Sequence, residues 1–433
     1  IFTIRTIQNP EYKSPLRPNW QGVDAEKIDG RTVRLTLKQP YAPFINNAAL
    51  KIIPKHIWEK IAPESAALSE FNLKPIGSGK YKFENFTQSS GGAITEYALS
   101  RNEEYYGIKP HLSNIVFSFF PTQEELLAAY QKNLIDGINA LSTNVLGLLV
   151  KSDLAIYRLH LPRVFSLFLN GSEQPILADK NIRVALAEAI DKKNLVSQAL
   201  AGGADPDTSP IPQGVIGREE SQSAFPYDPE NAKKLIEKAG WKLDQTSQTW
   251  EKTEIVKKQK ITSELSFTIT TSDFPDLVAA AKYVQSSWAA VNIKTNLDVK
   301  PISDLEIVNI KPRKYEILLF GEVYDHDPDP FAFWHSSQIK DPGLNIALYT
   351  NKQADTLLEE ARRTSDAGAR TKKYDAFQTI VQNDVGAIFL YSPAYFYGVR
   401  NTFKGIAINN IVFPSERFNN IENWYIKTKR VLK

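Results

Sequence analysis

Hydrophobic and polar residues alternate along two short stretches of the chain, which is the pattern of a β-strand with one buried face. Between Arg31 and Lys38 every second residue is apolar, from Val33 to Leu37. Residues 265–270 repeat the pattern, with apolar side chains at every odd position. We therefore predict a half-buried strand at each of these stretches.

Other stretches repeat their apolar residues every three or four positions, as amphipathic helices do. Thr122 and Glu125 have the spacing of a capping box and precede an apolar stripe. Asp228 and Pro229 suit the first positions of another helix, and Gly240 suits a left-handed stop after it. Because strand and helix patterns alternate throughout the chain, we predict an α/β or α+β fold.

The chain has 433 residues, with 52 basic and 49 acidic side chains and a formal net charge of +3. This length predicts two or three packed units rather than one core. The balanced charge, with no basic run, gives no support to nucleic-acid binding. No stretch approaches the roughly 18 consecutive apolar residues that span a bilayer. Cysteine is absent, which excludes disulfides, thiol nucleophiles and thiolate metal sites.

The segment from Tyr324 to Trp334 carries the strongest chemical signal in the sequence. It places three carboxylates within five residues, together with two prolines and a group of aromatic residues. Clustered carboxylates repel one another, so they need solvent, a metal or a cationic ligand nearby. The ammonium group of a peptide is such a ligand, and aromatic rings suit packing against peptide side chains. The alternative interpretation is a turn in which the aspartates bond to their own backbone.

Other chemical signals are weaker. His326 and His335 are nine residues apart and stand beside acidic residues, so a metal or metal-chelate site remains an open interpretation. Residues 77–80 resemble a phosphate-binding loop, but Tyr81 stands where that motif needs Ser or Thr. Neither H-E-x-x-H nor G-x-S-x-G occurs, so the sequence marks no hydrolase site.

Five segments match, in order, the characteristic segments of a known family. They are residues 53–58, 75–81, 101–106, 170–191 and 227–241. The second and third, for example, match the patterns P-x-G-S/T-G-x-Y and R-N-x-x-Y-Y. In this order, over nearly the whole chain, they resemble family 5 solute-binding proteins, the peptide, dipeptide and nickel receptors of ABC importers. Two sites depart from the family pattern, since Lys80 and the pair Val385-Gly386 stand where a proline is usual.

The resemblance implies an α/β fold with two lobes and a hinge, like the periplasmic binding proteins of type II and large cluster C. The expected divisions are residues 1–165 for lobe I, 166–388 for lobe II, and 389–433 for a return segment that completes lobe I. Apolar runs at 165–169 and 388–399 are the expected hinge crossings. The resemblance also implies that the start of lobe I is missing, with roughly a hundred residues expected before Ile1.

The resemblance further implies a receptor and not an enzyme, binding a small peptide between the lobes and delivering it to ABC transporter membrane subunits. In the family, an aspartate of the corresponding lobe II loop pairs with the peptide amino terminus, and this role fits Asp325 first and Asp327 second. The aromatic residues expected beside the ligand are Tyr324, Phe331 and Trp334. Arg101 fits either a carboxylate-binding role or a structural ion pair.

We expect a monomer outside the cytoplasm, either in a periplasm or anchored by a lipid at the cell surface. No cofactor, no metal and no nucleic-acid partner are expected. A metal-chelate or oligosaccharide receptor on the same fold is the nearest alternative. A sensory receptor and a hydrolase on a two-lobed scaffold are the alternatives from other classes.

Overall fold

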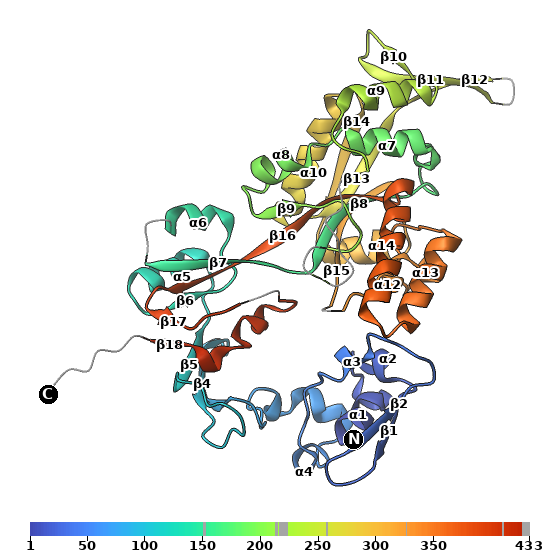
Figure 1. Cartoon of the computed structure of the whole chain (residues 1–433). Helices are drawn as coiled ribbons and strands as arrows, with labels where there is room; N and C mark the ends of the chain where they lie inside the picture. Colours follow the sequence, from blue (N-terminus) through green and yellow to red (C-terminus); the bar gives the residue numbers. More distant parts are fainter. Residues whose placement is uncertain are drawn as a thin grey trace.

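The structure is a computed structural model that describes residues 1–149, 153–212, 215, 224–256, 259–325, 327–408 and 411–426. Figure 1 shows an upper lobe built around a large sheet and a lower part that holds the N-terminus. The long strand β16 (Ala387–Arg400) runs from one to the other. Within the described residues, no helix is both long and apolar enough to cross a membrane.

The upper lobe is a sheet with helices on both faces. Its strands, in spatial order, are β14 (Lys294–Lys300), β13 (Ser266–Ser272), β15 (Ile317–Val323), β8 (Arg163–Leu169) and β16. The helices are α7 (Lys180–Glu188), α9 (Pro229–Lys238) and α10 (Pro275–Ala289) on one face, and α13 (Lys352–Arg363) and α14 (Ala367–Asp384) on the other. β13 is parallel to both neighbours, whereas β8 is antiparallel to β15 and β16. β13 confirms the strand predicted at 265–270.

The central strands of this sheet are apolar on both faces because both faces are covered. In β15, Ile317 and Leu319 pack against the α7 side, whereas Leu318 packs against the α13 side. Leu167 and Phe168 of β8 divide between the two sides in the same way. All five side chains have no exposed surface. The continuous apolar runs in the sequence therefore belong to the middle layer of a three-layer lobe.

The chain passes between the two parts where β16 changes its partner. Residues 387–391 of β16 pair with β8, and residues 394–400 pair with β7 (Leu154–His160). The chain crosses between the two parts a second time at Leu161 and Pro162, which join β7 to β8. Because β7 and β8 both pair with β16, the two crossings lie side by side. The change of partner lies close to the lobe boundaries expected from the sequence.

The lower part consists of smaller units. Its strands are β3 (Tyr81–Gln88), β4 (Ile94–Arg101) and β5 (Asn114–Ser118) in one antiparallel sheet, with β6 (Gly137–Ile138) beside β16. Two helices, α5 (Gln123–Gln131) and α6 (Thr143–Leu149), pack near β6 and β7. Further elements of the described residues, most of them in the upper lobe, are α8 (Lys192–Asn194), α11 (Ile302–Asp304), β9 (Ala204–Pro206), β10 (Lys242–Asp244), β11 (Thr249–Val256), β12 (Gln259–Glu264), β17 (Phe403–Lys404) and β18 (Tyr425–Ile426).

The first 58 residues form a small N-terminal unit beneath the upper lobe. Its elements are α1 (Phe2–Gln8), α2 (Arg17–Trp20), β1 (Asp24–Lys27), β2 (Val33–Thr36), α3 (Phe44–Asn47) and α4 (Lys55–Trp58). β2 forms where a half-buried strand was predicted, but Val33 is 49% exposed and only Leu35 packs on the core of the unit. The predicted buried face is incomplete because β2 has a single partner, β1, and this pair belongs to no larger sheet.

The helix ends predicted from the sequence are confirmed. The Thr122 hydroxyl accepts a hydrogen bond from the Glu125 amide at 3.2 Å. The Asp228 carboxylate accepts one from the Asn231 amide at 2.9 Å. Gly240 has a φ of 89°, the left-handed conformation that ends a helix.

Candidate ligand-binding site

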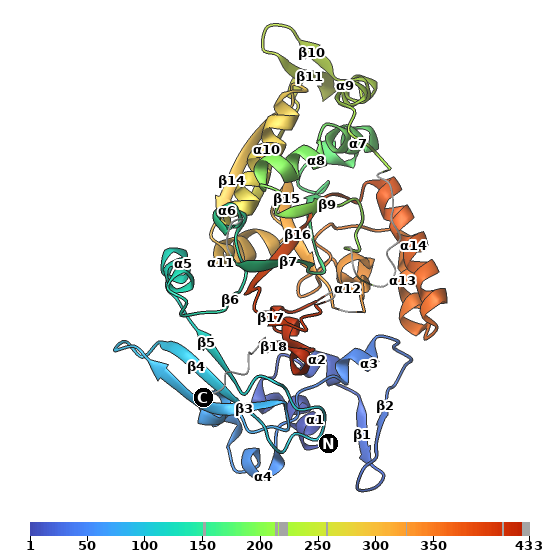
Figure 2. The same cartoon turned by 60° about the vertical axis from the view of Figure 1, so that its left-hand side comes forward.

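The acidic loop, residues 324–330, follows β15 directly and leads into the short helix α12 (Phe331–Trp334). Ligands of open α/β sheets bind outside the carboxyl ends of the strands, and this loop lies at such an end. In both views of the molecule, α3 of the N-terminal unit lies below α12 (Figures 1 and 2). The acidic loop therefore faces the N-terminal unit.

A pocket of about 310 Å³ lies between the acidic loop and the N-terminal unit, which form its two walls. The acidic loop contributes Tyr324, Asp325, Asp327 and Asp329 to one wall. The opposite wall includes Asn19, Tyr41, Asn46 and Asn47 of the N-terminal unit. The pocket thus combines carboxylates from one part of the molecule with amides and a phenol from the other.

Asp327 is held inside its wall by an arginine. Arg370 of α14 donates a hydrogen bond to Asp327 Oδ2 at 2.7 Å, and the two side chains are 6% and 8% exposed. Burial raises the pKa of Asp327, the Arg370 guanidinium lowers it, and the charges of Asp329 and Asp325 raise it further. Because most of its surface is covered and Arg370 holds its carboxylate, Asp327 fixes the shape of the loop. It also lines the pocket and contributes its charge there.

Asp329 is engaged by residues from both walls. Arg362 of α13 donates to both of its carboxylate oxygens, and the Tyr41 hydroxyl donates to Oδ2 at 3.0 Å. Asp325 is exposed and also lines the pocket. Arg362 and Arg370 thus hold Asp329 and Asp327 in the wall, and Asp325 is the most exposed of the three carboxylates.

The aromatic residues expected beside a ligand differ in position. Tyr324 lines the pocket although it is only 3% exposed. Trp334 has no exposed surface and packs against Phe377 and Phe389 in the core. The structure therefore does not bring Trp334 into the pocket, because the indole fills the centre of the lobe. Its place is beneath the acidic loop.

Phe331 also lies outside the set that lines the pocket. His335 stacks on its ring at a centroid distance of 4.1 Å, and the Arg362 guanidinium carbon lies 3.8 Å from the ring centroid. Two planar groups at these distances need opposite faces of the ring. Both faces of Phe331 are covered, so its flat surfaces are not open to a ligand.

Arg101 lies on β4, in the lower part of the molecule, and does not line the pocket beside the acidic loop. It makes an ion pair with Glu103 at 2.7 Å and donates to the Pro110 carbonyl at 3.1 Å. Of the two alternatives that the sequence left open, these contacts fit the structural ion pair.

Of the two histidines that the sequence suggested for a metal site, only His335 lies within the described residues. His326 lies outside the described residues. His335 contacts Glu359 at 3.4 Å and Asp355 at 3.9 Å. Among the residues that the structure describes, no group of three or more His, Cys, Asp or Glu side chains is arranged to hold a metal ion.

Several residues of this site carry no local signal in the sequence. Glu322 on β15 is 1% exposed, and it accepts hydrogen bonds from Tyr324 and from the Trp334 indole, each at 3.2 Å. Burial raises the pKa of Glu322 to about 8. Together with Arg362 and Arg370 it supports the acidic loop from below. A single buried carboxyl within an apolar strand gives no pattern of its own in the sequence.

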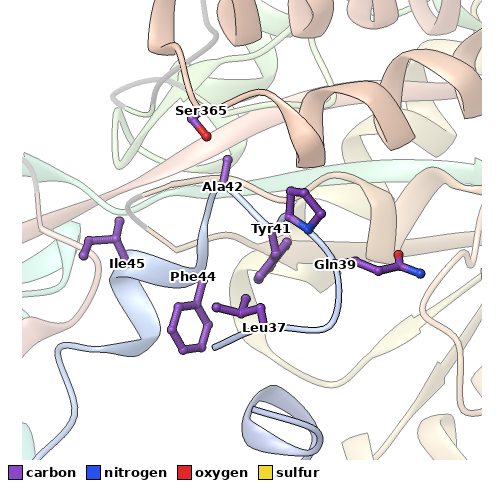
Figure 3. A pocket seen from close by; sticks show the side chains of 8 residues that line it. Leu37, Gln39, Tyr41, Ala42, Phe44, Ile45 and Ser365 are labelled. Carbon is purple, nitrogen blue, oxygen red and sulfur yellow. The ribbon is translucent and has the colours of Figure 1, made fainter. Parts of the chain in front are cut away.

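A second pocket, of about 430 Å³, lies on the other side of Tyr41. Figure 3 shows Leu37, Phe44 and Ile45 of the N-terminal unit on one side and Ser365, from the loop between α13 and α14, on the other. Its lining is mainly apolar. Tyr41 lines both pockets, so it stands at the point where the N-terminal unit meets the upper lobe.

Comparisons with known proteins agree with this architecture. The sequence profile of the family described as "Bacterial extracellular solute-binding proteins, family 5 Middle" matches residues 1–344. The oligopeptide-binding protein AppA of Bacillus subtilis is 26% identical over 443 residues, covering 98% of this chain and 76% of AppA. The structure of that AppA with a nonapeptide has a TM-score of 0.71 and 25% identity, covering 99% of this chain and 83% of AppA.

A further solved structure supports the fold alone. The ABC transporter substrate-binding protein CtaP of Listeria monocytogenes has a TM-score of 0.82 at 23% identity, covering 98% of this chain and 83% of CtaP. The two-lobed α/β fold predicted from the sequence is confirmed by these matches. Since the family profile covers most of the chain, this protein belongs to the bacterial extracellular solute-binding proteins of family 5.

Proposed function

We propose that this protein is the receptor of an ABC importer, and that it binds peptides between its two lobes and delivers them to the membrane subunits. Its relative AppA is named an oligopeptide-binding protein and has been solved with a nonapeptide. The receptor acts outside the cytoplasm, free in a periplasm or held by a lipid anchor, and leaves the peptide chemically unchanged.

The observation that carries this proposal is the exposed carboxylate of Asp325 at the edge of the pocket between the two walls. Asp325 is exposed, whereas Asp327 is buried and Asp329 half-buried, so the Asp325 carboxylate is the one that a ligand reaches most easily. A peptide ammonium group at Asp325 gains a charge-assisted hydrogen bond, about twice as strong as a neutral one. Asp325 is therefore the residue to which we assign the amino terminus.

The opposite wall supplies the second half of the proposed site. The amides of Asn19, Asn46 and Asn47 line the pocket and suit the main chain of an extended peptide, whatever its side chains. A ligand that touches both walls binds better when they are close, so it selects the closed arrangement. In this proposal residues 1–165 and 389–433 form one lobe and residues 166–388 the other, and they move about the two crossings beside β7 and β8.

Calorimetry with two peptides that differ only in an acetylated amino terminus tests the role of Asp325. We expect Asp325→Asn to weaken binding of the unmodified peptide by about tenfold or more, which equals about 1.4 kcal/mol, and to leave the acetylated peptide almost unaffected. Asp304→Asn is the matched control, since Asp304 is an exposed carboxylate of the same lobe that does not line the pocket. Equal losses for both peptides would remove Asp325 from the site.

A second measurement addresses the class of protein. Mass spectrometry of a peptide incubated with the protein is expected to recover it at full length, bound and uncleaved. Recovery of fragments would instead favour a hydrolase.

A further inference from the structure

Tyr41 and Ala42 reach from the N-terminal unit to the upper lobe and join the two walls of the acidic pocket. The Tyr41 hydroxyl donates a hydrogen bond to Asp329 Oδ2 at 3.0 Å, across 288 positions of the sequence. The Ala42 amide donates to the Arg362 carbonyl at 2.7 Å. These bonds connect a loop of the N-terminal unit to the acidic loop and to the last turn of α13 in the upper lobe. They define a direct tie between the walls.

The Arg362 side chain organises this tie. Its Nε and Nη2 donate to Oδ1 and Oδ2 of Asp329 at 3.1 and 2.7 Å, in the two-pronged geometry that a guanidinium allows. Its guanidinium carbon lies 3.8 Å from the centroid of Phe331 and 5.3 Å from that of Tyr41. His335 covers the other face of Phe331. The rings of His335 and Phe331, the guanidinium of Arg362 and the ring of Tyr41 thus follow one another from the upper lobe into the N-terminal unit.

The upper lobe and the N-terminal unit contribute to this contact in different ways. Arg362, Asp329 and Phe331 all belong to the upper lobe, and their contacts with one another involve no residue of the N-terminal unit. Tyr41 adds only its hydroxyl and its ring, and Ala42 only its amide. The upper lobe therefore presents a formed socket, and the N-terminal unit inserts one side chain into it.

We infer that Tyr41 is a positioning residue that latches the two walls around a bound ligand, through the socket formed by Asp329 and Arg362. This inference rests on the proposed function, because the latch closes the pocket in which the peptide lies. It assigns Asp329 to the tie between the lobes and Asp325 to the ligand. The latch acts on how long the ligand stays, because it forms when the walls meet.

Stopped-flow dissociation of a labelled peptide from the Tyr41→Phe protein is the principal test. The phenylalanine ring keeps its place over Arg362 and loses the hydroxyl bond to Asp329. A single hydrogen bond accounts for a factor of roughly 3 to 10, so we expect the dissociation rate to rise by that factor with little change in the association rate. The rise is expected to be equal for unmodified and acetylated peptides, which separates the latch from the role of Asp325.

Two further variants sharpen the test. Arg362→Lys keeps the positive charge but removes the two-pronged contact and the stacking, so its effect is expected to exceed that of Tyr41→Phe. Tyr106→Phe is the matched control, because Tyr106 is 87% exposed and lines neither pocket. An unchanged dissociation rate in Tyr41→Phe would overturn the latch.

The latch can also be measured without any ligand. The chain has no cysteine, so two can be introduced for fluorescent dyes, at the exposed positions Lys27 on β1 and Lys372 on α14. Energy transfer between them reports the fraction of molecules with closed walls, and Tyr41→Phe is expected to lower that fraction. If the protein binds no peptide, the proposed function fails while this measurement still decides the latch. An identical distribution of energy transfer in the parent protein and in Tyr41→Phe would refute the latch.

Discussion

The two walls of the acidic pocket are built in different ways. The wall from the upper lobe stands on the core, where Tyr324 is 3% exposed and Trp334 fully buried. The wall from the N-terminal unit stands on α3, a helix of four residues with none of them buried. Its unit has a core of only four buried apolar residues. One wall is therefore fixed by its own lobe, and the other depends on contacts across the pocket.

This difference suits a receptor that must bind and release. A carboxylate held in place by the core costs little ordering when a ligand arrives, which favours affinity. A wall with little packing of its own opens at low cost, because local stability follows the number of buried contacts. In the proposed receptor, chemical specificity belongs to the wall of the upper lobe, whereas opening and release belong to the N-terminal wall.

Breaking the buried ion pair of the fixed wall is expected to have the largest effect on stability. Arg370→Met leaves Asp327 in a covered position without its partner, which typically costs about 3–5 kcal/mol of unfolding free energy. Urea unfolding measures this loss. Arg363→Met is the control, since Arg363 is exposed, and its effect is expected to stay within about 0.5 kcal/mol. Similar effects for both variants would mean that the fixed wall does not depend on this pair.

The pH dependence of stability provides a second test of the fixed wall. Burial raises the pKa of Glu322 from its ordinary value of 4.5 to about 8, so the folded protein holds a proton that the unfolded chain has lost. Its contribution to stability is complete below pH 4.5 and is lost as the pH rises to about 8. The slope within this window reaches about 1.4 kcal/mol per pH unit.

Replacing the buried carboxyl with an amide removes this titration. Glu322→Gln keeps an oxygen that accepts from Tyr324 and Trp334, so unfolding at a series of pH values is expected to give a flatter curve for the variant. Glu237→Gln, on the exposed face of α9, is expected to leave the slope as it is. Parallel curves for the parent protein and Glu322→Gln would show that Glu322 is charged in the folded state throughout.

Local parts of this architecture are predictable from sequence because their causes are local. The Thr122 cap and the left-handed Gly240 depend on residues three or fewer positions away, and both form as expected. The acidic loop is also visible in the sequence, since its three carboxylates lie within five residues. Its place at the carboxyl end of a strand follows from the apolar run before it.

The partners of the loop are not predictable in this way. Arg362 lies 33 residues from Asp329, and Arg370 lies 43 residues from Asp327. They meet only because α13 and α14 return to cover the sheet. The sequence pattern assigned aromatic residues of this segment to the ligand, but Trp334 is used by the core. Within a segment of several aromatic residues, the sequence does not show which ring will point into the core and which toward the pocket.

The departures from the family pattern have structural explanations. Lys80, which stands where a proline is usual, donates to the Asn419 carbonyl and pairs with Glu422, contacts that a proline cannot make. At Gly386 an added Cβ would lie 3.0 Å from Tyr349 and 3.3 Å from Trp334. Both substitutions are therefore tied to neighbours distant in sequence, and neither affects the pocket walls directly.

The N-terminal wall offers the smallest expected effect on stability and the clearest contrast with Arg370. Asn46 lines the pocket from α3, and its side-chain amide has no hydrogen-bond partner among the described residues. Asn46→Ala is therefore expected to change the unfolding free energy by less than about 0.5 kcal/mol. Peptide affinity, in contrast, is expected to fall by a factor of roughly 3 to 10, because one hydrogen bond to the ligand is lost.

Urea unfolding and calorimetry on the same Asn46→Ala preparation give both quantities. Gln21→Ala, an exposed position of the same unit that does not line the pocket, is expected to change neither. A large loss of stability in Asn46→Ala would mean that the N-terminal wall has a fixed structure of its own. Closure of the pocket would then require two preformed surfaces to meet, and the distinction between a fixed and an adaptable wall would no longer hold.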